Sequence, residues 1–183
     1  GYPLYTMGGW LWFRLGRLLL GPDSNPIPIL SSYSTLWALV ALWLCYRTLL
    51  EVTDDGDGGN RPIALLVTAF YGVTYFFWYY AVTSEQYTSA VAWTLAVTLL
   101  AFRWQRAQAA EAGVNGAGWR PSDRYIMALA LLVGVALAHM VTLLLALLAL
   151  AGLLLGTQPA LLRRSRILAS GALLVLLPLA SYA

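Results

Sequence analysis

Residues 76–102 read FFWYYAVTSEQYTSAVAWTLAVTLLAF, two apolar arms around a short polar turn that contains Glu85. Tyrosine and tryptophan rings crowd both sides of this turn, as they do where acyl chains meet lipid headgroups. The pattern therefore predicts a hairpin of membrane helices whose turn lies at one membrane surface. A carboxylate at the rim of a hydrocarbon layer costs a few kcal/mol on insertion scales, so Glu85 needs a partner or a task.

Small residues follow one face of the helix after the turn. Ser84, Thr88, Ala92 and Ala96 recur every fourth residue, a spacing that lets another helix backbone approach closely. We therefore expect Glu85 to point into a bundle of helices. Its carboxylate is interpreted either as a functional group or as a structural one, bonded to helix-end amides or to an arginine.

The composition is that of a multi-pass, all-α membrane protein. Of 183 residues, 60% are hydrophobic and only 10% are charged, against about 25% charged residues in soluble domains. The chain has no lysine, which excludes Schiff-base lysines and Walker-type phosphate loops. Its single cysteine, Cys45, excludes an internal disulfide. The net charge of +3 comes from arginines in flanking loops, which indicates topology control and not nucleic-acid binding.

The first residues predict a helix that lies in the membrane surface. Residues 4–20 are apolar but carry Arg14 and Arg17, the pattern of an interfacial amphipathic helix. The prolines within residues 22–28 are expected to break any helix there. Residues 1–26 are thus predicted to form an external interfacial segment, followed by a helical bundle over residues 30–183.

We predict about six membrane crossings, some of them short or broken. They cover residues 30–50, 62–80, 86–102 and 167–182, together with two short helices within residues 126–155. As a single straight helix that last run would measure about 45 Å, against a hydrocarbon core of about 30 Å. A turn near His139 is therefore preferred, and one tilted crossing is the alternative.

The distribution of arginines predicts the topology. Arg47 and the clusters that begin at Arg103 and Arg163 are expected to face the cytoplasm. The N-terminal segment, Glu85 and His139 then face outward. The lone acid and the lone imidazole of the apolar spans are predicted to converge on one leaflet.

The loop over residues 54–60, DDGDGGN, resembles half of a calcium-binding loop. The glutamate required at its twelfth position is Leu65 if Asp54 is the first. A solvated, flexible turn is the preferred interpretation, calcium binding is the lesser alternative, and no metal site is predicted.

Four short motifs, in this order, carry a family resemblance: GYPLY at residues 1–5, SEQY at 84–87, HMVT at 139–142 and LPL at 177–179. They resemble the elements HPPGYPLY, AEVY, NHLT and YLPLR of large polytopic bacterial membrane proteins related to protein O-mannosyltransferases, which have the GT-C glycosyltransferase fold.

The resemblance implies a fold, a substrate and site residues. Such proteins take a sugar from a polyprenyl-phosphate carrier in the outer leaflet of the bacterial inner membrane, and no other cofactor is expected. Such a donor needs a cation or hydrogen-bond donor at its phosphate and a carboxylate for the acceptor's proton. In this chain Glu85 is the candidate catalytic group, as an orienting or proton-handling carboxylate, with His139 or Arg14 toward the phosphate and Tyr2 and Tyr87 toward the substrate. The family's acidic catalytic loop precedes GYPLY, so residues 1–183 read as one part of a longer membrane domain.

Two alternatives from other functional classes stay open. The chain is also interpretable as a non-catalytic structural subunit of a larger membrane complex, in contact with lipids and other membrane subunits. His139, as an imidazole on an apolar helix, is a possible pigment or haem ligand. It is equally a residue that satisfies carbonyls freed at a broken helix.

Overall fold

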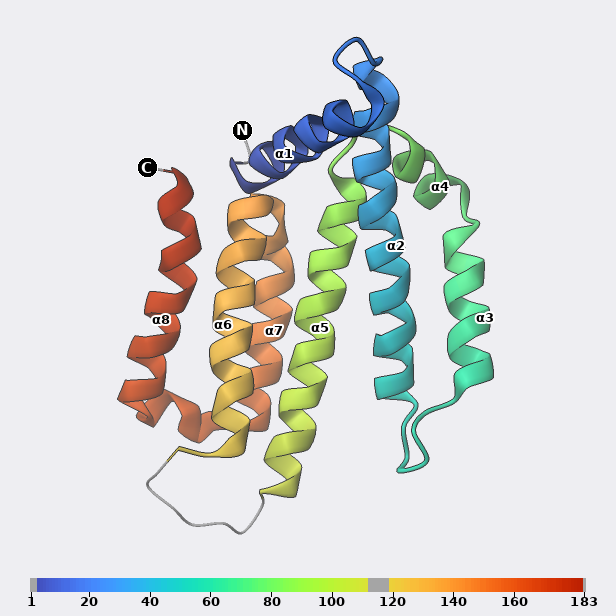
Figure 1. Ribbon diagram of the computed structural model, residues 1–183. Coiled ribbons are helices and arrows are strands. Elements are labelled where there is room, and N and C mark those ends of the chain that lie inside the picture. The colour runs from blue at the N-terminus through green and yellow to red at the C-terminus, as the bar shows by residue number, and fades with distance from the viewer. Residues whose placement is uncertain (1–2, 112–118, 183) are drawn as a thin grey trace. The chain divides into compact units, whose positions relative to one another are not determined.

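The computed structural model describes residues 3–111 and 119–182, and every regular element in these ranges is a helix (Figure 1). The prediction of an all-α protein is confirmed. The chain forms two compact units, Gly1–Leu95 and Ala96–Ala183, and helix α5 (Tyr87–Ala110) begins in the first and continues in the second. That these units form a single membrane domain stays a prediction.

The first unit is built around one long helix. It contains α1 (Pro3–Leu20), α2 (Pro26–Val52), α3 (Arg61–Gly72), α4 (Tyr75–Val82) and the start of α5. Helix α2 contacts α1, α3 and α4, which makes it the centre of the unit. The helix predicted over residues 4–20 is confirmed as α1.

Glycines let α1 lie close against α2. A Cβ on Gly8 would come within 2.3 Å of the Tyr33 hydroxyl, and one on Gly16 within 2.4 Å of the Ile29 side chain. Trp12 donates a hydrogen bond from its indole nitrogen to the Ser32 hydroxyl at 2.9 Å. The amphipathic helix is therefore docked on α2 by fitted side chains.

The predicted helix break is confirmed at residues 21–25, between α1 and α2, but Pro26 and Pro28 belong to the first turn of α2, which corrects the prediction for these two prolines. The chain turns at Gly21, whose φ is +97°, and α2 begins at Pro26. A proline is tolerated in the first turn, because the amide it lacks has no partner within the helix. The Asn25 side chain accepts a hydrogen bond from the Ile27 amide at 3.0 Å and caps the helix.

The crossing predicted over residues 62–80 is broken, a second correction. Helices α3 and α4 meet at an angle of 66°. Gly72, Val73 and Thr74 occupy the bend, and glycine and β-branched residues are poor helix formers. Thr74 donates a side-chain hydrogen bond to the Tyr71 carbonyl at 2.7 Å, which stabilises the bend.

The second unit contains the rest of α5 and six further elements. These are α6 (Pro121–His139), η1 (Val141–Leu143), α7 (Leu144–Thr157), η2 (Pro159–Arg163), α8 (Ser165–Leu179) and η3 (Ala180–Tyr182). Met140 is extended, with φ −157° and ψ 110°, and α7 runs in the direction opposite to α6 (Figure 1). The predicted break near His139 is confirmed, but only α7, with 14 residues, is short, whereas α6 has 19 residues and is long enough to cross a membrane.

Helices α6 and α8 are in close backbone contact. Gly134 permits this, because a Cβ there would lie 2.4 Å from the Val175 carbonyl oxygen. Toward the other end of this pair, Trp104, Ile126, Leu161 and Ile167 form a buried apolar cluster. The unit is thus held by one tight helix pair and one cluster of large side chains.

By length and composition, three described helices are suited to cross a membrane, or four if the bent α3–α4 pair counts as one span. The three are α2, α6 and Ser165–Tyr182. Helix α7 has only 14 residues, and α5 is diluted by threonines, glutamines and arginines. The helical membrane bundle is confirmed, and the predicted six crossings exceed this count.

Candidate functional site

The turn that carries Glu85 is attached to α2 by one buried serine. The Ser34 hydroxyl donates to the Glu85 carbonyl oxygen at 2.9 Å and accepts from the Glu85 amide at 3.1 Å. Thr88, at the start of α5, donates to the Ser34 carbonyl oxygen at 3.0 Å. Ser34 and Thr88 are both buried, so the turn is bracketed from two sides and its backbone position is fixed.

The end of α4 is attached to α2 in the same way. Thr35 follows Ser34 on α2 and donates to the Ala81 carbonyl oxygen at 2.8 Å. Side-chain hydroxyls therefore satisfy backbone carbonyls on both sides of the turn, where helix ends leave such groups without intrahelical partners.

The Glu85 side chain itself is exposed. We expected it to point into the bundle, but within the first unit it lies outside the packed helices. Of the small residues that follow the turn, Thr88 and Ala92 are buried while Ser84 is exposed. The packed part of this helix face therefore begins at Thr88, after Glu85. The Glu85 side chain is accessible to a ligand.

Tyr5 on α1 lies beside Ser34, the residue that holds the Glu85 turn. Its ring packs on Tyr33 with centroids 5.5 Å apart, and its hydroxyl shares a hydrogen bond with Ser34. Burial raises the pKa of the Tyr5 phenol, the bond with Ser34 opposes this, and the negative charge of Glu85 raises the pKa further. Tyr5 therefore stays protonated at neutral pH. The motifs at residues 1–5 and 84–87 thus meet in space, although the sequence singled out Tyr2 and not Tyr5.

An open pocket of about 680 Å³ lies between the bent α3–α4 pair and the start of α5. Its wall consists of rings and short side chains, among them Tyr71, Phe77, Tyr80, Tyr87, Thr88 and Thr94. The rings of Tyr80 and Tyr87 touch, with centroids 4.4 Å apart. Tyr87, one of the predicted substrate residues, therefore lies on the wall of an aromatic pocket two residues from Glu85.

The other predicted residues of the N-terminal segment are less enclosed. Arg14 is exposed on α1, with its guanidinium carbon 5.2 Å from the centroid of the Trp10 ring. Beside it, α1 and the start of α2 line a second open pocket of about 480 Å³, whose wall includes Trp12 and Ile29. Tyr2 lies outside the described residues.

His139 belongs to the second unit, where it is the last residue of α6 and only 2% exposed. The carbonyl of its neighbour Ala138 accepts a hydrogen bond from the Tyr182 hydroxyl at 3.4 Å. The predicted convergence of His139 with Glu85 relates two separate units and stays a prediction. Pigment or haem ligation by His139 likewise stays a prediction.

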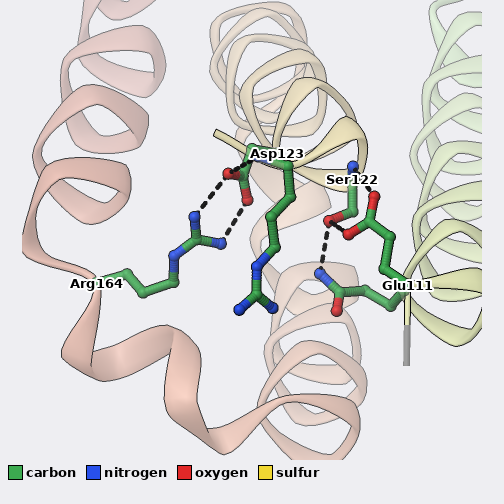
Figure 2. Close-up of polar contacts among 6 residues, drawn as sticks. Glu111, Ser122, Asp123 and Arg164 are labelled. Carbon is green, nitrogen blue, oxygen red and sulfur yellow. Dashed lines mark hydrogen bonds and ion pairs between the residues drawn. The ribbon is translucent and has the colours of Figure 1, made fainter. Parts of the chain in front are cut away.

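The opposite end of α6 carries a polar cluster (Figure 2). Arg164 forms two parallel hydrogen bonds with the Asp123 carboxylate, at 2.5 and 2.6 Å. The same carboxylate accepts the Arg120 backbone amide at 2.9 Å and so caps the first turn of α6. A bidentate pair of this kind has strong geometric specificity. It fixes the end of η2 against the beginning of α6.

A second carboxylate closes the same end. Glu111 accepts the Ser122 amide at 2.8 Å and the Ser122 hydroxyl at 2.6 Å, and Gln108 donates to that hydroxyl at 2.9 Å (Figure 2). These contacts join the end of α5 to α6. The sequence indicated only that arginines gather here. The pairing of Asp123 with Arg164, 41 residues apart, has no local signal.

In the acidic loop after α2, the first carboxylate accepts hydrogen bonds from the loop's own backbone. Asp54 accepts the amides of Gly56 at 3.0 Å and Gly58 at 2.8 Å, and both glycines have positive φ. Within residues 3–111 and 119–182, no group of three or more histidine, cysteine or carboxylate side chains is placed to hold a metal ion.

A family model described as the N-terminal domain of the protein O-mannosyl-transferase TMEM260 matches residues 1–161. The chain belongs to this family. The match includes the whole first unit and three of the four motifs, so the resemblance to protein O-mannosyltransferases is confirmed. No curated protein and no solved structure matches the chain. As a member of the TMEM260 N-terminal family, it is a membrane protein related to O-mannosyltransferases.

Proposed function

We propose that this chain forms the donor-binding part of a membrane glycosyltransferase that takes a sugar, mannose by its family, from a polyprenyl phosphate. The observation that carries this proposal is the aromatic pocket whose wall ends two residues from the exposed Glu85 carboxylate. An isoprenoid tail needs an apolar groove, and aromatic faces suit both the tail and a sugar ring. Membership of the O-mannosyl-transferase family supports the reaction class.

The chemistry assigns a role to each polar group. In the transfer step the acceptor hydroxyl forms a bond to the anomeric carbon of the sugar, and the bond from that carbon to the phosphate oxygen breaks. The polyprenyl phosphate leaves with the bonding electrons, and the hydroxyl proton passes to a carboxylate. We assign Glu85 to this proton. Arg14, exposed on the same unit, supplies a cation for the phosphate.

The proposed location follows from charge. The arginine clusters favour the cytoplasmic side, so the Glu85 turn faces the outside of a bacterial inner membrane, where the donor lipid is presented. The two hydrogen bonds between Ser34 and the Glu85 backbone support the assignment of Glu85 to the proton. A carboxylate that accepts a proton must be held in one position relative to the reacting groups.

Donor binding tests the proposal. Full-length protein carrying Tyr87→Leu is expected to retain polyprenyl-phosphate mannose about tenfold more weakly than wild type, because a ring on the pocket wall is lost. Tyr75→Leu is the matched control, since Tyr75 is an exposed ring on α4 outside the pocket wall. Native mass spectrometry of each variant with added donor gives the occupancy. Equal retention by both variants, or stoichiometric co-purification with other membrane subunits and no donor binding, would contradict the proposal.

A further inference from the structure

The two units differ in charge. The first holds four arginines and six carboxylates, a net charge of −2, whereas the second holds seven arginines and two carboxylates, a net charge of +5. The seven lie in the last turns of α5, at the N-cap and first turn of α6, and at the η2–α8 junction. They are Arg103, Arg106, Arg120, Arg124, Arg163, Arg164 and Arg166. Within the second unit these helix ends lie on one side (Figure 1).

Both carboxylates of this unit already have partners. Asp123 is bonded to Arg164, and Glu111 is bonded to Ser122 (Figure 2). Arg163 and Arg166 flank Arg164 and are exposed. Among the described residues neither forms an ion pair. Their positive charge is therefore available to an anion from outside the chain.

Residues close to these two arginines in the sequence line an apolar cavity. It is open to the outside, has a volume of about 280 Å³ and is lined by α6, α7, η2 and α8, with no charged or hydroxyl side chain in its wall. Leu161 and Ile167 are part of this wall. Leu161 is two residues before Arg163, and Ile167 directly follows Arg166. One wall of the cavity and the two arginines thus come from the same short segment, residues 161–167, where η2 ends and α8 begins.

We propose that this place binds one anionic phospholipid, with an acyl chain in the cavity and the phosphate against Arg163 and Arg166. An acyl chain matches a wall without polar groups, and a phosphate matches two unpaired guanidinium groups. Basic pockets between membrane helices on the cytoplasmic side suit anionic headgroups. The site does not rest on the proposed transferase function, which uses the first unit.

Lipid retention by the full-length protein tests this site. Phosphatidylglycerol and phosphatidylcholine with identical acyl chains are added in neutral detergent, and occupancy is measured by native mass spectrometry. We expect wild type to retain phosphatidylglycerol about 25-fold better than phosphatidylcholine, since each arginine near an anionic headgroup contributes roughly fivefold. Arg163→Gln with Arg166→Gln should abolish this preference. Arg47→Gln with Arg61→Gln removes the same charge from the first unit and should preserve it.

A cavity variant separates the acyl chain from the headgroup. Ala151→Leu fills the cavity from its exposed wall and should lower the retention of both lipids, while Ala149→Leu, on the same helix but outside the wall, should not. Equal retention of the two lipids by wild type, or an undiminished preference in the double variant, would overturn the proposal. Displacement of phosphatidylglycerol by polyprenyl-phosphate mannose would also overturn it. None of these results alters the Tyr87 comparison, which reports on the first unit.

Discussion

At the scale of single residues, Ser34 is the side chain that fixes the position of the Glu85 turn. One hydroxyl satisfies both backbone groups of Glu85 from within a fully buried position. Ser34→Ala removes the donor to the Glu85 carbonyl and leaves the Glu85 amide with the Thr83 carbonyl, at 2.9 Å, as its acceptor. We therefore expect the free energy of unfolding to fall by about 1–3 kcal/mol. Ser31→Ala, one turn earlier on α2, should change it by less than about 0.5 kcal/mol. Thermal unfolding in detergent gives the change in unfolding free energy for each variant. Equal changes would show that the hydrogen bonds of Ser34 do not hold the turn.

Asp123 plays the corresponding part in the second unit. Its side chain is 1% exposed and Arg164 is 23% exposed, so the pair is largely but not fully removed from water. Asp123→Asn leaves a guanidinium without its counter-charge, and we expect a loss of about 2–4 kcal/mol. Arg163→Gln, at the neighbouring exposed arginine, should cost less than about 0.5 kcal/mol in neutral detergent. A melting temperature of Asp123→Asn equal to that of wild type would refute the structural role of the pair.

At the scale of helices, the contact between α6 and α8 depends on Gly134. Gly134→Ala places a methyl group 2.4 Å from the Val175 carbonyl oxygen and must push the helices apart. We expect a destabilisation of about 1–3 kcal/mol. Gly152→Ala on α7 meets open space and should instead stabilise by about 0.5–1 kcal/mol, because alanine is the better helix former. Opposite signs for the two variants in thermal unfolding confirm the packing, and equal signs contradict it.

Sequence patterns were sufficient for the helices whose boundaries have local chemical causes. The amphipathic α1, the break after His139 and the small residues at the start of α5 all follow from residue types in one short window. The bend between α3 and α4 was missed, because an apolar run hides the weak helix formers Gly72, Val73 and Thr74. Pro26 was predicted to break a helix, but it is the first residue of α2. Proline is disfavoured inside a helix and favoured at its first position, so the residue type alone does not distinguish the two cases.

At the scale of the whole molecule, charge divides the chain more clearly than hydrophobicity does. The first unit is acidic and carries the exposed Glu85, and the second is basic at one end and apolar elsewhere. The candidate site was predictable only in part. Glu85 and Tyr87 stood out as polar and aromatic residues beside a membrane turn. Ser34 and Tyr5 did not, because their role depends on contacts between positions some 50 to 80 residues apart in the sequence.

The rate of sugar transfer tests the central claim most directly. Full-length protein in proteoliposomes, supplied with polyprenyl-phosphate mannose and an acceptor, is compared with its Glu85→Gln and Glu51→Gln variants. A carboxylate that takes the acceptor proton contributes about 10²–10⁴-fold. The account predicts that Glu85→Gln lowers kcat by at least about 100-fold with donor binding unchanged, and that Glu51→Gln transfers sugar at the wild-type rate. Transfer by Glu85→Gln at the wild-type rate would contradict it.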